Sequence, residues 1–140
     1  MASPHKRSAE ESISRTPKKS RRSFDVDSFF KVVVGRKPDQ KTFLVHEEII
    51  CERSEFFRRA MNGNWAESTD RIVKLPEDRV EIFETYLNLI YTGKIPTELH
   101  AVPPTLDQML SEYECLFRLY ILAEKLQDID AKNAAIESVL

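Results

Sequence analysis

Residues 41–61 read KTFLVHEEIICERSEFFRRAM, and the hydrophobic pattern of this stretch changes at His46. Residues 42–45 are rich in β-branched and large apolar side chains, which is typical of a β-strand. After His46 the apolar residues recur at helical spacing, and Ser54 can cap the start of a second helix. The stretch therefore predicts a strand followed by two short helices packed as a hairpin. The positions at helical spacing are Ile49, Ile50, Arg53, Phe56, Phe57, Ala60 and Met61.

The residues before this stretch predict a partner strand. Residues 29–34 are almost continuously apolar and β-branched, as in a buried strand. The Lys-Pro-Asp sequence at 37–39 signals a turn, because proline pre-sets the backbone angle φ. Residues 29–34 and 42–45 are therefore expected to form a β-hairpin.

The residues after the stretch predict a third strand and a buried helix. Asn62-Gly63 supplies a helix stop, Trp65 follows in a loop, and residues 71–75 alternate as a strand that ends at Pro76. The next helix is expected to begin at Glu77 and Asp78, since acids stabilise a helix N-terminus, and to end at Thr92-Gly93. Its two apolar stripes indicate a central helix that is buried on most of its circumference. The stripes are Val80, Phe83, Leu87 and Ile90, and Ile82, Tyr86 and Leu89.

The C-terminal part predicts a loop and two more helices. Residues 94–107 contain three prolines and are expected to be irregular. Helices are predicted over about 106–127, with a break left open, and over about 130–140. The element order favours an α+β domain with a helical majority and a small sheet. The first helix has an apolar stripe of Leu116, Leu119, Tyr120, Ala123 and Leu126, and the second begins one with Ile136, Val139 and Leu140.

Charge divides the chain into two parts. The 140 residues have a net charge of −2, but residues 1–23 hold seven Lys/Arg and two Glu, a net +5. Residues 24–140 hold the other 14 basic and 21 acidic residues, a net −7. Polar, Ser-rich and basic composition predicts that residues 1–23 are a disordered tail and that residues 24–140 form the domain. No apolar run reaches the roughly 18–20 residues that span a bilayer, so a membrane partner is not expected.

Motifs across residues 28–140 resemble the BTB/POZ family, most closely its short fungal members. The resemblance implies an α+β fold in which a small sheet caps one end and a central helix packs between helical pairs. The motif residues are Phe43, Val45, His46, Arg53, Ser54, Phe56, Phe57, Trp65, Leu75, Pro76, Phe83, Tyr91 and Gly93.

One position departs from the family pattern. Many relatives carry an acidic residue early on the first strand, where this chain has Phe29, and Asp27 lies two residues earlier. In dimeric animal members that acid belongs to a charged groove at the dimer interface. The departure weakens the expectation of this mode of dimerisation.

The tail resembles a bipartite nuclear localisation signal. Ten residues separate two basic clusters, a spacing that lets an extended chain reach two acidic grooves of a nuclear import receptor. The alternative is a solvated basic tail with loose affinity for nucleic acid. Thr16 and Ser23 are candidate phosphorylation sites, and a phosphate at Thr16 would add about −1.5 to −2 charges beside the second cluster. The clusters consist of Lys6, Arg7, Lys18, Lys19, Arg21 and Arg22.

Enzymatic chemistry and cofactors are not expected. His46 and Cys51 invite a nucleophile–base reading, but their spacing on a helix does not bring the side chains together, and no Gly-rich oxyanion loop accompanies them. Cys51 and Cys115 lie inside apolar helical patterns, which favours buried, reduced thiols, while a disulfide between them stays open on counting alone. Neither has a second Cys or His nearby at metal-ligand spacing. The acidic pairs lie at helix starts and on polar faces, and are interpreted as structural.

Three functions compete. The first is a nuclear protein-interaction module that self-associates or recruits a partner. The second, implied by the resemblance, is an adaptor for a cullin-type ubiquitin ligase, with the contact around residues 47–61 and the loop after Tyr91. The third is direct nucleic-acid binding, which the net −7 of residues 24–140 disfavours. Loops 36–41 and 94–104 are candidate partner contacts. Trp65 is either an exposed partner anchor or a residue that packs over the helical hairpin.

Overall fold

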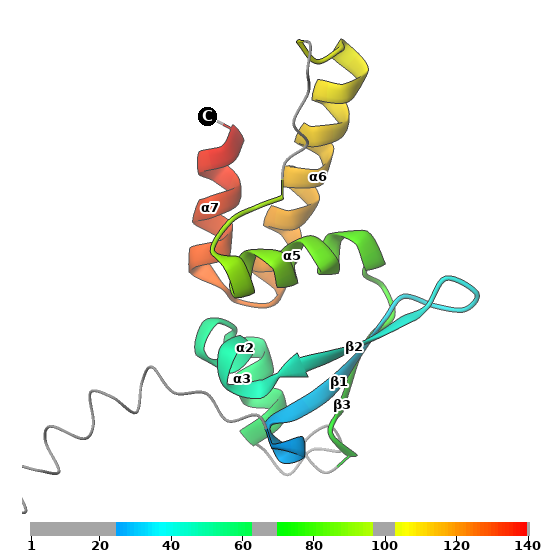
Figure 1. The fold of residues 1–140 in the computed structure, drawn as a ribbon, viewed down its shortest axis with the longest axis vertical. Helices are drawn as coiled ribbons and strands as arrows, with labels where there is room; N and C mark the ends of the chain where they lie inside the picture. The colour runs from blue at the N-terminus through cyan, green and yellow to red at the C-terminus, as the bar shows by residue number, and fades with distance from the viewer. Residues whose placement is uncertain (1–24, 63–69, 97–102, 140) are drawn as a thin grey trace, which may run out of the picture.

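The computed structural model describes residues 25–62, 70–96 and 103–139. Figure 1 shows a helical majority with a small sheet at one end, as predicted. The central helix lies between the sheet with its helical hairpin and the two C-terminal helices (Figure 1). The elements are η1 (Val26–Ser28), β1 (Phe29–Val34), β2 (Lys41–His46), α2 (Glu47–Arg53), α3 (Glu55–Asn62), β3 (Ile72–Leu75), α5 (Val80–Thr92), α6 (Leu106–Lys125) and α7 (Ile129–Val139).

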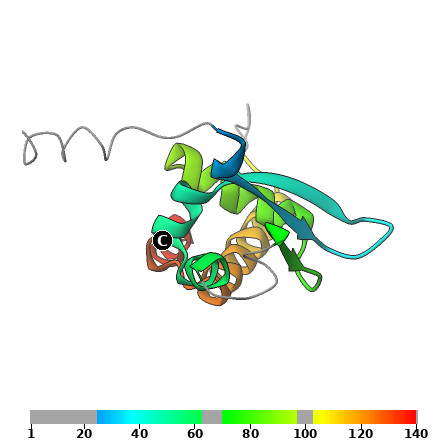
Figure 2. The same ribbon diagram turned by 90° about the horizontal axis from the view of Figure 1, so that it is seen from below.

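The three-stranded sheet has the order β2-β1-β3. β1 pairs antiparallel with β2, with Phe30 opposite Val45, and parallel with β3, with Val32 opposite Val73. Alternate side chains of β1 are buried while Lys31 is exposed, because successive side chains of a strand point to opposite faces. The predicted strands are confirmed, and their loop extends away from the helices in Figures 1 and 2.

The central helix α5 starts later than expected. It begins at Val80 rather than at Glu77 or Asp78, because the chain turns after Leu75 and Pro76, with the Asp78 amide donating to the Leu75 carbonyl. Its end is as predicted: Gly93 adopts φ +78°, and its amide donates to Leu89. Buried residues lie on both predicted stripes, namely Ile82, Phe83, Tyr86, Leu89 and Ile90.

Helix α6 runs unbroken for 20 residues and begins with a capping box between Thr105 and Gln108. Helix α7 packs beside it, and its buried residues are Ala131 and Ala135. The expected inward stripe of α7 is wrong, since Ile136 and Val139 are exposed, and Leu140 lies outside the described residues. Small alanines let the two helices approach closely, while the larger Ile136 and Val139 line a partly open cavity between α6 and α7.

Aromatic rings join the layers of the core. Phe57 of the hairpin contacts Phe30 of the sheet, with ring centroids 5.8 Å apart, and Phe83 of α5 at 6.5 Å. Phe83 also meets Phe43 at 5.2 Å. Sheet, hairpin and central helix therefore share one core. Within the described part of the chain, no helix is long and apolar enough to span a membrane.

Candidate protein-interaction surface

Half of the family-motif residues that the structure describes are buried, and three more are half-buried. Their fully buried side chains hold the sheet, the hairpin and α5 together, so these positions support the fold and leave little surface for a partner. The buried apolar motif residues are Val45, Phe57, Leu75 and Phe83, and Phe43 and Phe56 pack against them half-buried.

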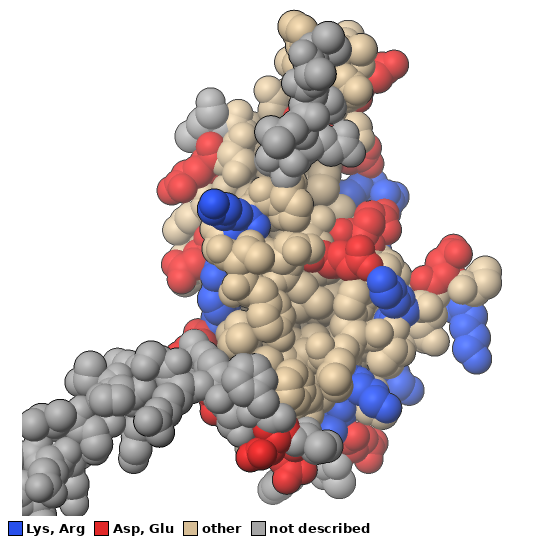
Figure 3. All heavy atoms as spheres, viewed as in Figure 1, with Lys and Arg blue, Asp and Glu red and all other residues tan. Residues whose placement is uncertain are grey.

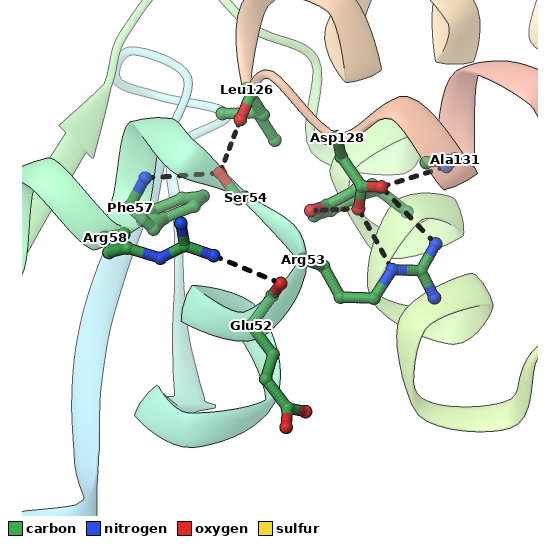
Figure 4. A network of polar contacts seen from close by, with 9 residues as sticks. Glu52, Arg53, Ser54, Phe57, Arg58, Leu126, Asp128 and Ala131 are labelled. Carbon is green, nitrogen blue, oxygen red and sulfur yellow. Dashed lines mark hydrogen bonds and ion pairs between the residues drawn. The ribbon is translucent and has the colours of Figure 1, made fainter.

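Asp128 is the centre of a buried polar network in the turn between α6 and α7 (Figure 4). Its carboxylate forms an ion pair with Arg53 at 3.3 Å and accepts hydrogen bonds from the Tyr86 hydroxyl and the Ala131 amide, both at 2.9 Å. Burial, and next the negative charge of Asp128, raise the pKa of Tyr86. Asp128 therefore ties α2, α5 and α7 to one point.

Ser54 forms a second link in the same place. Its hydroxyl donates to the Leu126 carbonyl at 2.6 Å and accepts from the Phe57 amide at 3.2 Å (Figure 4). The predicted helix-capping role is confirmed. The hydroxyl also attaches the hairpin to the end of α6, which capping alone does not require.

His46 and Tyr91 position the start of the hairpin. The His46 amide donates to the Tyr91 hydroxyl at 2.8 Å, and the His46 ring lies 5.0 Å from the Phe29 ring. His46 is buried, whereas Tyr91 is 46% exposed. Of this pair, only the tyrosine ring is available to a partner.

Arg71 lies beside the start of β1. Its guanidinium forms an ion pair with Glu47 at 2.6 Å and donates to the carbonyls of Asp27 and Phe29. This cation is therefore satisfied within its own chain. The departure at Phe29 stays a prediction, and the negative charge that faces Arg71 here comes from Glu47 of α2.

The thiol of Cys51 is unsuited to nucleophilic chemistry. Burial, and next the charge of Glu47, raise its pKa from 9.0 to about 11, so the thiol is protonated at neutral pH. Cys51 and Cys115 are both free and half-buried. In the described ranges, no group of three or more His, Cys, Asp or Glu side chains could hold a metal ion.

The charged loop between β1 and β2 is neutralised locally. Acidic and basic side chains lie side by side toward this loop in Figure 3. Arg36 pairs with Glu77, and Lys41 with Glu84 at 2.5 Å. Exposed pairs of this kind contribute about 0–1 kcal/mol each. The loop therefore presents mixed charge rather than a surface of one sign.

Helices α6 and α7 carry the exposed apolar surface. Apart from Leu44 and Tyr91, every exposed large hydrophobic side chain in the described part of the chain belongs to these two helices. A cavity of about 500 Å³ opens between them, with Tyr113, Phe117 and Ile136 in its lining. The remaining exposed large hydrophobic residues on these helices are Leu106, Met109, Leu110, Ile121, Ile129 and Val139.

This surface was missed in the sequence. The pattern of α6 was interpreted through one inward stripe, yet Leu106, Leu110, Phe117 and Ile121 fall outside that stripe. The available signal was that α6 is apolar on several sides, as α5 is, but this reasoning was applied only to α5. Trp65, the six basic residues of the tail clusters, Thr16 and Ser23 lie outside the described residues.

Comparison with known proteins agrees with this geometry. The BTB/POZ domain family matches residues 20–133. Armadillo BTB Arabidopsis protein 1 of Arabidopsis thaliana is 32% identical over 77 residues, which cover 53% of this chain and 10% of that protein. The match therefore spans about a tenth of the length of this curated relative.

Two solved structures share the fold. The BTB domain of zebrafish PATZ1 superimposes with a TM-score of 0.52 at 18% identity, covering 77% of this chain and 73% of that one. The BTB domain of human gigaxonin gives 0.55 at 18% identity, with 77% and 74% covered. The family match over residues 20–133 shows that the chain belongs to the BTB/POZ family, whose domains are protein–protein interaction modules.

Proposed function

We propose that this chain is a non-enzymatic interaction protein of the nucleus that self-associates or recruits another protein. The observation that carries the proposal is the concentration of exposed large hydrophobic side chains on α6 and α7. Contiguous apolar patches of this kind on a folded domain mark protein-binding surfaces. The motif residues of the core are buried, so partner choice falls to these helices.

The nuclear part of the proposal rests on the tail. Its two basic clusters and net +5 suit the acidic grooves of an import receptor. The net −7 of residues 24–140 repels phosphate, which favours a protein partner over nucleic acid.

Affinity purification followed by mass spectrometry tests the proposal. The full chain is compared with a chain lacking residues 1–23, and a fluorescent fusion reports location. We expect the shortened chain to lose the import receptor and nuclear accumulation, and to keep the partners bound by the domain. A full-length fusion excluded from nuclei would contradict the nuclear part. Failure to recover any partner or second copy would contradict the interaction part.

An adaptor role for a cullin-type ligase is the second candidate. Tyr91 favours it, because its ring is half-exposed at the end of α5, beside the loop where family resemblance places part of that contact. Helices α2 and α3 argue against it, since their described large apolar side chains are all buried or half-buried. A pull-down tests this role by comparing Tyr91→Ala with Leu44→Ala, which changes another exposed side chain and serves as the control. If only the control variant retains a cullin, the adaptor role is supported. If the wild-type chain recovers no cullin, the role is excluded.

A further inference from the structure

An exposed apolar stripe runs along nearly the whole of α6. It consists of Leu106, Leu110, Tyr113, Phe117 and Ile121, and we call these five residues the α6 stripe. Their spacing of four, three, four and four residues places them within about 80° of the helix circumference and over about 22 Å of its length. The side chains are between 46% and 69% exposed. None of these five residues belongs to the inward stripe that holds α6 to the core.

We propose that the α6 stripe is a self-association surface, on which α6 of a second copy packs antiparallel. This inference rests on the proposed function and names one partner for it. The outer residues of the stripe are symmetric about a point between Tyr113 and Glu114. In an antiparallel pair Leu106 therefore lies against Ile121 of the second copy, and Leu110 against Phe117.

The charges beside the stripe fit this orientation. Asp107 and Arg118 lie on the same flank of α6, so an antiparallel pair brings Asp107 of one copy near Arg118 of the other. In a parallel pair this flank would face the opposite flank of the second copy, so Asp107 and Arg118 would not meet. The two Glu114 carboxylates come near the symmetry axis, and each is already paired with its own Arg118 at 3.0 Å. Antiparallel helices also align their dipoles favourably.

The area is sufficient for a dimer. Five large side chains that are about half exposed offer roughly 500 Å², within the range of functional patches on monomers. Met109, Ile136 and Val139 flank the stripe and are also exposed. Together they approach the roughly 800 Å² per partner of a standard interface. At the other candidate interface, around β1, the Arg71 cation already pairs with Glu47 of its own chain.

Light scattering over a range of concentrations is the first test. We expect the full chain to reach the mass of a dimer, and the Leu110→Glu, Phe117→Glu variant to remain a monomer with an unchanged circular dichroism spectrum. Leu44→Glu is the matched control, because Leu44 is 66% exposed on β2, away from the stripe, and it should still dimerise.

Cross-linking tests the geometry directly. Tyr113→Cys places a thiol near the symmetry axis of the pair, so a cross-linker about 10 Å long, matched to the spacing of packed helices, should join two copies. Leu44→Cys should give no more cross-linked dimer than wild type. The wild-type chain measures any cross-linking through the native thiols. In the same assay Asp107→Arg should weaken dimerisation roughly threefold to tenfold, and adding Arg118→Asp should restore part of the loss.

The outcomes separate the two proposals. A dimer that survives Leu110→Glu with Phe117→Glu, and that Tyr113→Cys does not cross-link, overturns the α6 stripe while self-association stands. A wild-type monomer at every concentration overturns the stripe and the self-association half of the proposed function together. Recruitment of a different protein would then be decided by the affinity purification alone.

Discussion

The two halves of α6 are both rich in apolar residues and are used differently. Leu119, Leu122 and Ala123 of the second half are buried against the rest of the domain, whereas Leu106, Leu110 and Tyr113 of the first half are exposed. Hydrophobic content does not distinguish them. The difference arises at the turn after α6, where Asp128 contacts Arg53 and the Leu126 carbonyl accepts from Ser54, which attaches the buried half to the helical hairpin.

This contrast separates residues of the fold from residues available for binding. The buried half ends in contacts to motif residues Arg53 and Ser54. The exposed half has no motif residue, so it is free to differ in what it binds without disturbing the core. Changes in the first group should therefore alter folding stability, and changes in the second should alter association.

Asp128→Ala should break the attachment of the buried half and have the largest effect. It leaves the Arg53 charge, the Tyr86 hydroxyl and the Ala131 amide without their shared partner. Removing one member of a buried ion pair costs about 3–5 kcal/mol of unfolding free energy. Urea denaturation measures the loss. Glu114→Ala, which removes an exposed ion pair of the other half, is the control and should cost under about 1 kcal/mol. If Asp128→Ala and Glu114→Ala lost the same unfolding free energy, the two halves of α6 would not differ in their contribution to the fold.

Ser54→Ala should weaken the same attachment by less. It removes a helix cap and the hydrogen bond to Leu126, and the expected loss of unfolding free energy is about 1–2 kcal/mol. The matched control is Ser138→Ala on α7, whose hydroxyl makes an exposed bond to the Ala134 carbonyl. The control should lie within about 0.5 kcal/mol of wild type. If the two variants lose the same amount, Ser54 is not an attachment point.

The sequence was sufficient for the elements but not for their attachments. The change from strand-like to helical spacing of apolar residues at His46 identified β2 and the helical hairpin α2–α3, because that spacing depends only on residues close together in the chain. Ser54 was recognised as a cap because a capping bond spans three residues. Asp128 gave no such signal, because its partner Arg53 lies 75 residues away.

The candidate surface was less predictable for a related reason. Helix α6 is apolar on several sides, and periodicity cannot say which side the rest of the domain covers. The alanines of α7 decide it, since Ala131 and Ala135 are buried in the domain while Ile136 and Val139 remain outside. That outcome depends on contacts between helices, which no single helix pattern contains.

Alkaline pH should lower the unfolding free energy through the thiol of Cys51, which lies in the helical hairpin. Folding raises the pKa of this thiol from 9.0 to about 11, so the folded protein keeps a proton that the unfolded chain loses. This stabilisation is complete below about pH 9 and is lost as the pH rises through about 11. Between pH 8 and 10 the loss is about 1 kcal/mol or less for a half-buried group. Urea denaturation at both pH values should show a smaller drop for Cys51→Ser than for wild type, with Cys115→Ser as the control. Equal drops would place the alkaline sensitivity elsewhere.

The smallest effect on folding is expected where the effect on association is largest. In dilute solution Leu110→Ser with Phe117→Ser should change the unfolding free energy by only about 0.5 kcal/mol, because these exposed side chains touch little of their own domain. At higher concentration the wild-type midpoint should rise, since a dimer stabilises the folded state by mass action, and the variant's midpoint should not. Thermal unfolding across a hundredfold range of concentration measures both. A loss of several kcal/mol at dilution would show that Leu110 and Phe117 support the fold as the buried residues of α6 do.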